Sequence, residues 1–153
     1  MFGALYYSIG CFFIAGIFTF LSAMSRPIQS KGESRPWVTF IVWMAVVFSG
    51  PYLYAEALTG WVVPDIEKSV KAVYEGVDVN GPMRFYRVTW YTGDSAKVVA
   101  VGKEPMSWAG GFDRPIVAFN MVKNSNGKWE CKSYRMVYSD RLLRDGVTFP
   151  PYW

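Results

Sequence analysis

The side chains that could perform acid–base chemistry gather towards the C-terminus, where three aspartates stand among three arginines. They are Asp113, Asp140 and Asp145 with Arg114, Arg141 and Arg144. Two carboxylates held close together can act as general acid and base. Opposite charges that alternate along a chain, however, are typical of a solvated surface with ion pairs. We therefore expect these residues to form surface salt bridges and not a catalytic pair.

Residue types suited to nucleophilic and metal chemistry are scarce. The chain contains no His, which is the commonest ligand of haem, zinc and copper and the usual general base near neutral pH. Its two cysteines, Cys11 and Cys131, lie in different halves of the chain, which excludes a disulfide framework and a CxxC motif. Because Cys131 has no His partner, we expect no nucleophilic role for it. Both cysteines are predicted to be reduced and isolated.

Motifs that bind phosphate or present a catalytic serine are also absent from the sequence. Gly102 and the pair Gly110–Gly111 are not followed by Lys-Ser/Thr or by a helical pattern. Residues 62–153 carry 13 Lys+Arg and 10 Asp+Glu, an excess too small for a nucleic-acid-binding surface. The sequence therefore predicts no enzyme activity, no cofactor and no metal site, and it disfavours nucleic acid and small molecules as partners.

The composition indicates a membrane protein with two dissimilar parts. Of the 153 residues 52% are hydrophobic and 18% are charged, whereas soluble domains carry about 25% charged residues. Among residues 1–61 the charged side chains are Arg26, Lys31, Glu33, Arg35 and Glu56, while residues 62–153 carry 23. We predict a transmembrane helical hairpin over residues 1–61 and a small water-facing domain over residues 62–153.

Two uncharged runs are long enough to cross a bilayer as helices. They cover residues 2–24 and about 37–59, and a helix needs about 20 apolar residues to span a hydrocarbon core of roughly 30 Å. Positive charges follow the first run instead of preceding it, which argues against a cleaved signal peptide. Trp37 and Trp61 flank the second run, as expected for aromatic rings in the headgroup zone.

The segment between the two runs predicts the orientation in the membrane. Residues 25–36 contain three basic side chains and one acidic side chain, and short basic loops remain cytoplasmic. Both termini and the domain 62–153 are then extracytoplasmic. The absence of an Asn-x-Ser/Thr sequence favours a bacterial inner (plasma) membrane or an organellar equivalent. Glu56 is expected at the outer edge of the second span, where water solvates it, and not at a buried ion site.

The pattern after Trp61 predicts an α+β domain with one helix and about four antiparallel strands. Residues 64–76 have helical spacing, and residues 84–91 and 97–101 form a hairpin. A second hairpin joins residues 116–122 to 128–138 through a turn that contains Asn-Gly. A helix over one face of a curved sheet is similar in architecture to cystatin-like and nuclear-transport-factor-like modules, although no diagnostic motif of either group occurs.

Alternation within the strands predicts which side chains are buried. Tyr86, Val88 and Trp90 fall on one face of the first strand and are expected to face the core. Trp129 and Cys131 alternate with charged residues in the last strand, so Cys131 is also expected to face the core. Its presence is thereby explained without catalysis.

Two segments carry aromatic and apolar side chains outside the predicted elements. The loop 103–115 contains Met106, Trp108 and Phe112, and the tail ends in Tyr152 and Trp153. Long loops without structure of their own are often functional, and large aromatics are enriched both at interfaces and in cores. These five residues are candidate partner-binding residues, with packing against the domain's own core, or for the loop contact with lipid headgroups, as the alternatives.

These features together predict a non-catalytic accessory or structural subunit of a larger integral membrane protein complex. Small residues on the helices would allow neighbouring helices to approach, namely Gly3, Gly10, Gly16, Ala45 and Ser49. The expected partners are the lipid bilayer and other integral membrane subunits. The alternatives are a freestanding membrane-tethered periplasmic binding or assembly module, such as a secretion-system component, and a sensor or lipid-binding pocket beneath the sheet.

Overall fold

The computed structural model describes residues 2–25, 35–106 and 110–152. Within it the chain divides into two compact units, Met1–Tyr52 and Leu53–Trp153. The domain boundary predicted between residues 61 and 62 falls inside the second unit, because the last turns of the second apolar helix belong to that unit.

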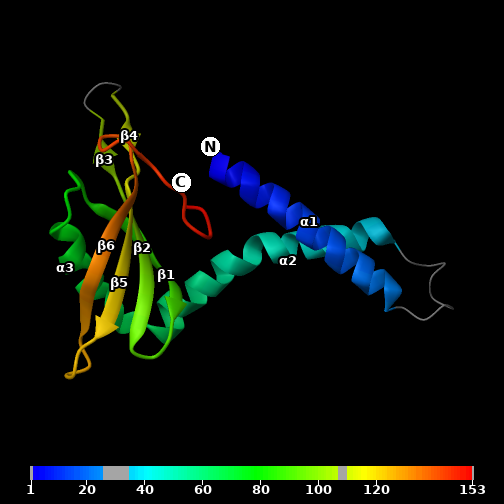
Figure 1. Cartoon of the computed structure of the whole chain (residues 1–153), viewed down its shortest axis with the longest axis horizontal. Coiled ribbons are helices and arrows are strands. Elements are labelled where there is room, and N and C mark those ends of the chain that lie inside the picture. Colours follow the sequence, from blue (N-terminus) through cyan, green and yellow to red (C-terminus); the bar gives the residue numbers. More distant parts are fainter. Residues whose placement is uncertain (1, 26–34, 107–109, 153) are drawn as a thin grey trace. The chain divides into compact units, whose positions relative to one another are not determined.

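The first unit consists of two long apolar helices (Figure 1). Helix α1 covers Phe2–Met24 and α2 begins at Pro36 and continues to Ala57, with Pro51 inside it. Both are long and apolar enough to cross a membrane. They contact each other through polar and aromatic groups: the Tyr7 hydroxyl donates to the Phe48 carbonyl at 2.6 Å, and the rings of Phe18 and Trp43 stack with centroids 4.8 Å apart. Two apolar helices were predicted, and their presence is confirmed.

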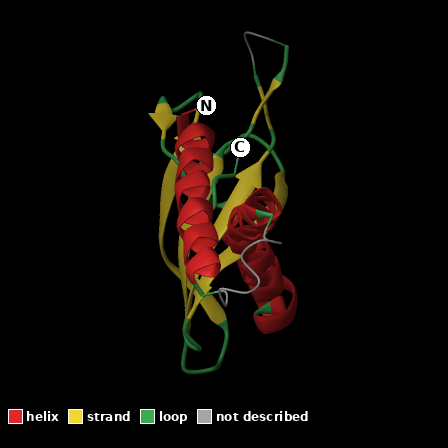
Figure 2. Ribbon diagram, turned by 90° about the vertical axis from the view of Figure 1, so that its right-hand side faces the viewer, coloured by secondary structure: helices red, strands yellow, loops and turns green. Residues whose placement is uncertain are grey.

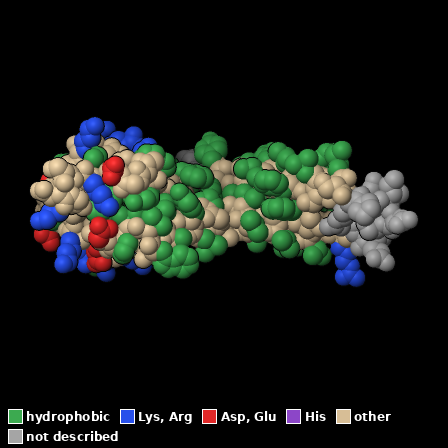
Figure 3. Space-filling model, turned by 90° about the horizontal axis from the view of Figure 1, so that it is seen from below, with side chains coloured by type: hydrophobic (Ala, Val, Ile, Leu, Met, Phe, Trp, Pro, Cys, Tyr) green, Lys and Arg blue, Asp and Glu red, His purple; other side chains and the backbone are tan. Residues whose placement is uncertain are grey.

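Most large apolar side chains of α1 and α2 point away from the helix pair (Figure 3). Exposed examples are Leu5, Ile9, Phe13, Ile17 and Phe20 on α1, and Val38, Ile41 and Val46 on α2. Cys11 and Ala15 are buried instead. Gly10 and Gly16 face open space, since a Cβ built at either position would meet nothing within 4 Å outside its own helix.

The second unit is an antiparallel sheet covered on one face by a helix (Figure 1). The sheet has the order β1-β2-β5-β6-β7, with β1 at Met83–Tyr91, β2 at Ser95–Gly102, β5 at Ile116–Lys123, β6 at Trp129–Ser139 and β7 at Arg144–Asp145. A separate ribbon pairs β3 (Glu104–Pro105) with β4 (Phe112–Asp113). The predicted small antiparallel domain with one helix is confirmed, whereas the short strands β3, β4 and β7 were not predicted.

Local turn chemistry explains the β5–β6 hairpin. The Asn124 side-chain oxygen accepts the backbone N–H groups of Asn126 and Lys128 at 2.9 and 3.0 Å. Gly127 has a φ of 73°, which is the left-handed conformation that glycine adopts without a steric cost. The predicted Asn-Gly turn therefore fixes the register of the two longest neighbouring strands.

The face of the sheet that α3 covers, called the inner face, carries the main core. Helix α3 covers Glu67–Glu75 and is preceded by a π-helical turn at Leu58–Val62 and a 3₁₀ turn at Pro64–Ile66. Their buried residues Leu58, Ile66 and Val70 pack with Val98, Phe119 and Met121 of the sheet. Trp129 belongs to this core, and Cys131 packs against it while remaining half-buried, as its alternation with charged residues predicted.

Strand β1 departs from simple alternation because it bulges between Val88 and Trp90. Val88 is fully buried and Tyr86 packs against the inner core, as predicted. Trp90 is 43% exposed, and Tyr91 packs against the core in its place. The prediction that Trp90 faces the core was wrong, because a bulge inserts one residue and reverses the faces beyond it.

Candidate partner-binding site

The segment predicted as a loop over residues 103–115 contains a two-stranded ribbon that extends beyond the end of the five-stranded sheet (Figure 2). In the antiparallel register Glu104 lies opposite Asp113, and Pro105 lies opposite Phe112. The Met106 N–H donates to the Gly111 carbonyl at 2.9 Å. The expectation of a loop without structure of its own is thereby corrected. Trp108 lies outside the described residues.

A buried carboxylate attaches the base of this ribbon to the domain. Glu104 is 3% exposed, and its Oε1 accepts the Asn80 N–H at 3.1 Å and the Arg141 Nε–H at 2.9 Å. Arg141 also donates to the Asp78 carbonyl at 2.6 Å and pairs with the Asp78 carboxylate. Glu104 and Arg141 thus connect the ribbon, the segment after α3 and the turn after β6.

Asp113 makes a second attachment from the other strand of the ribbon. It is 5% exposed, its Oδ1 accepts the Arg114 N–H at 2.7 Å, and its Oδ2 accepts the Asp140 N–H at 2.9 Å. The expectation of a surface salt bridge was wrong for Asp113, because backbone N–H groups satisfy the carboxylate inside the fold. Among the described residues Arg141 pairs with Asp78 and Glu104, and not with its neighbours in the sequence.

Phe112 is the exposed aromatic residue of the ribbon. Its side chain is 58% exposed, and the Lys103 ammonium lies 3.9 Å from the centroid of its ring. Met106 is half-buried. Because the Phe112 ring contacts a cation on the surface and not the domain's core, the ring is available to bind a partner.

A second exposed apolar side chain, Leu143, lies in the turn between β6 and β7. It is 91% exposed and has a φ of 50°, a conformation that is uncommon for residues other than glycine. The Leu142 N–H donates to the Ser139 hydroxyl at the start of the same turn. Sequence reasoning did not select Leu143; the available signal was two leucines within an otherwise charged run.

The C-terminal tail packs on the face of the sheet opposite α3, called the outer face. The Tyr152 ring lies 6.0 Å from the Phe85 ring, beside the buried cluster of Val99, Val101, Ile116 and Val137. The Tyr152 N–H donates to the Thr148 hydroxyl at 3.1 Å. Tyr152 therefore contributes to the domain's own packing, and Trp153 lies outside the described residues.

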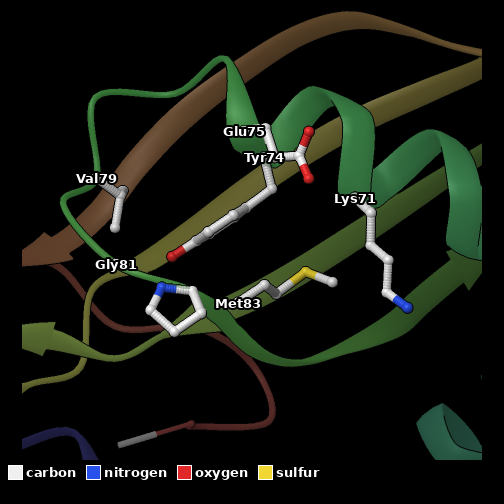
Figure 4. A pocket seen from close by; sticks show the side chains of 7 residues that line it. Lys71, Tyr74, Glu75, Val79, Gly81 and Met83 are labelled. Carbon is white, nitrogen blue, oxygen red and sulfur yellow. The ribbon is translucent and has the colours of Figure 1, made fainter.

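A cavity of about 420 Å³ lies between the end of α3 and the start of β1 (Figure 4). Lys71, Tyr74 and Glu75 of α3 line it together with Val79, Gly81, Pro82 and Met83. The Tyr74 hydroxyl is buried without a hydrogen-bond partner among the described residues. Burial, together with the charge of Glu104, raises the pKa of Tyr74 to about 12, so this hydroxyl is neutral at physiological pH.

Comparisons with family models, with curated proteins and with solved structures find no match to this chain. Within residues 2–25, 35–106 and 110–152 no group of three or more His, Cys, Asp or Glu side chains could hold a metal ion. Burial raises the pKa of the Cys131 thiol, which keeps it protonated and weakly nucleophilic.

Proposed function

We propose that this protein is a non-catalytic accessory subunit of a larger integral membrane complex. In this proposal α1 and α2 cross a bacterial inner membrane, with both termini and the second unit on the extracytoplasmic side. The ribbon β3–β4 and the neighbouring turn contact another subunit. The observation that carries the proposal is the exposed apolar surface of α1 and α2.

In this proposal the lipid bilayer surrounds the exposed apolar side chains of α1 and α2. Large apolar side chains are exposed along the length of both helices, and soluble monomers rarely expose apolar patches larger than a few hundred Å². The basic segment 25–36 supports the orientation, because short loops rich in Lys and Arg are retained in the cytoplasm.

Two glycines of α1 and two exposed side chains of the second unit support association with other membrane subunits. Gly10 and Gly16 face open space, and small residues of this kind allow the backbone of a neighbouring helix to approach closely. In the second unit Phe112 and Leu143 are exposed on segments attached by buried carboxylates. Aromatic side chains presented by a fixed backbone are typical interface anchors.

The alternative is a freestanding membrane-tethered periplasmic module that recruits another protein for binding or assembly, as in a secretion system. The position of Phe112 and Leu143 favours it, because both belong to the second unit and need no helix neighbour. The two proposals differ in what contacts the helices: other transmembrane subunits in the first, and lipid alone in the second.

Photo-crosslinking in native membranes tests the proposal at both surfaces. A photoreactive amino acid replaces Gly10 on α1 or Phe112 on the ribbon, with the exposed Lys68 of α3 as the matched control position. We expect crosslinks to integral membrane proteins from positions 10 and 112, and few from position 68. Crosslinks from position 112 alone would support the freestanding module, and the absence of protein crosslinks at both positions would contradict both proposals.

A further inference from the structure

The outer face of the sheet is covered over only part of its length. The tail covers the end that contains Val101 and Ile116, where Tyr152 packs against Phe85. Further along the strands the side chains of Lys97 and Asn120 are exposed. These two residues are cross-strand partners, so they mark a row of the outer face that the tail leaves open.

The rows of the outer face beyond Val101 carry basic side chains. The register aligns Arg87 with Val99, Ala118 and Arg135 across four strands. Lys97 lies in the next row. Arg87 is paired with the Glu56 carboxylate at 2.6 Å. Glu130, on the same face, accepts a hydrogen bond from Asn124 at the far end of the hairpin. Lys97 and Arg135 therefore supply the basic side chains of this surface.

Trp90 adds an exposed aromatic ring to this surface. The bulge in β1 places it opposite Lys97, whose ammonium lies 5.5 Å from the centroid of the Trp90 ring. An exposed Trp is costly in water but is favoured at the boundary between lipid and water. Its combination with basic side chains is the composition that binds anionic membrane surfaces.

The last turn of α2, which belongs to the second unit, contacts the edge strand of this surface. Glu56, in the last turn of α2, lies 2.6 Å from the Arg87 guanidinium. Trp61 follows in the π-helical turn and is 87% exposed. If α2 crosses the bilayer, Glu56 and Trp61 mark its exit. Trp90 lies about 10 Å from Arg87 along β1, given a strand rise of roughly 3.3 Å per residue.

We infer that the open outer face, comprising Trp90, Lys97 and Arg135, lies against anionic phospholipid headgroups of the bilayer that α2 crosses. This inference rests on the proposed membrane insertion of α1 and α2. It adds a lipid contact made by the sheet itself, with phosphate groups as the ligands of the basic side chains. Such a contact holds the domain on the membrane surface.

The test uses the full chain in lipid nanodiscs, with one fluorescent label at a time. Both native cysteines are first replaced (Cys11→Ala, Cys131→Ser), and a single cysteine is introduced by Asn120→Cys on the outer face. Lys68→Cys on α3 is the matched control, and Ile9→Cys on α1 reports insertion. Quenching is measured with nitroxide groups attached to the lipid headgroup or to the acyl chain, in discs with and without phosphatidylglycerol.

The inference predicts strong quenching of the label at position 120 by the headgroup nitroxide in discs that contain phosphatidylglycerol. The label at position 68 is quenched much less, and in pure phosphatidylcholine the two positions become similar. Lys97→Gln and Arg135→Gln each lower the ratio of docked to undocked domain about fivefold, as expected for one basic group at an anionic surface. Lys68→Gln leaves this ratio unchanged.

The label on α1 separates failure of this inference from failure of the proposed function. Acyl-chain quenching at position 9, with equal headgroup quenching at positions 120 and 68, overturns the lipid contact while membrane insertion stands. Quenching at position 120 that does not depend on phosphatidylglycerol or on Lys97 and Arg135 also overturns it. An α1 label that the acyl-chain nitroxide does not quench overturns the membrane insertion itself.

Discussion

The hydroxyl oxygen of Thr59 accepts the backbone N–H of Val88 at 2.8 Å and donates to the carbonyl of Ala55 at 2.6 Å. One side chain thereby joins the end of an apolar helix to the edge strand of the sheet. Edge strands present backbone N–H groups without partners, and here the π-helical turn after α2 supplies an acceptor. Leu58 packs in the inner core beside it, so the helix ends within the domain's own packing.

Replacing Thr59 with Val is expected to destabilise the second unit. The substitution keeps the shape of the side chain but leaves the N–H of the buried Val88 without an acceptor, at a cost of about 1–3 kcal/mol. Thr59→Ser is the matched control, because it retains the hydroxyl. Thermal unfolding of the full chain in detergent measures both, and a Thr59→Val protein as stable as the native one would refute this role.

Replacing Asp113 with Ala is expected to loosen the base of the ribbon. The change removes the acceptor for the Asp140 N–H from a buried position, with an expected cost of about 1–3 kcal/mol. Asp94→Ala, in the exposed β1–β2 turn, is the matched control and should change stability by less than about 0.5 kcal/mol. Hydrogen exchange of the Met106 and Asp140 amides reports the local effect; unchanged protection of both would contradict the attachment.

Replacing Phe112 with Ala is expected to weaken assembly without unfolding the domain. Phe112 is exposed, so its removal takes little from the core, whereas a buried aromatic anchor contributes about 2 kcal/mol or more to association. The matched change in the core is Phe119→Ala, which should cost about 3–5 kcal/mol of stability. Unfolding temperature and recovery of the assembly are measured together, and a large loss of stability in Phe112→Ala would contradict an interface role.

The stability of the second unit is expected to fall between about pH 10 and pH 12. Burial raises the pKa of Tyr74 to about 12, against about 10 in an unfolded chain. In this range the unfolded state releases the Tyr74 proton more readily than the folded state, so rising pH favours unfolding. In Tyr74→Phe part of this alkaline loss should disappear, while the stability at pH 7 changes little because the hydroxyl has no partner among the described residues. Denaturant midpoints at pH 7 and pH 11 measure the difference, and an unchanged loss would contradict this account.

Elements with a long uniform pattern could be predicted from the sequence. The apolar helices follow from two uncharged runs, and the β5–β6 hairpin follows from the Asn-Gly turn between two β-branched and aromatic runs. The ribbon could not be predicted in this way, because strands of two residues show no periodicity. Its base is attached through Glu104 and Asp113, whose hydrogen-bond partners Arg141 and Asp140 are distant in the sequence.

Individual side chains were mispredicted where tertiary contacts decide their surroundings. Trp90 was assigned to the core by alternation, but the bulge after Val88 reverses the face. Asp113 was assigned to the surface because charges surround it in the sequence, yet the fold supplies backbone donors that allow its burial. Of the five candidate partner-binding residues, the structure exposes Phe112, places Tyr152 in the domain's own packing and leaves Met106 half-buried.

The central claim, that this chain is a subunit of a larger membrane complex, is tested most directly by native mass measurement after gentle detergent extraction from the source membrane. The account predicts one or more species in which the 17.4 kDa chain is present in fixed stoichiometry with other integral membrane proteins. A monodisperse monomer, or an oligomer of this chain alone, would contradict it.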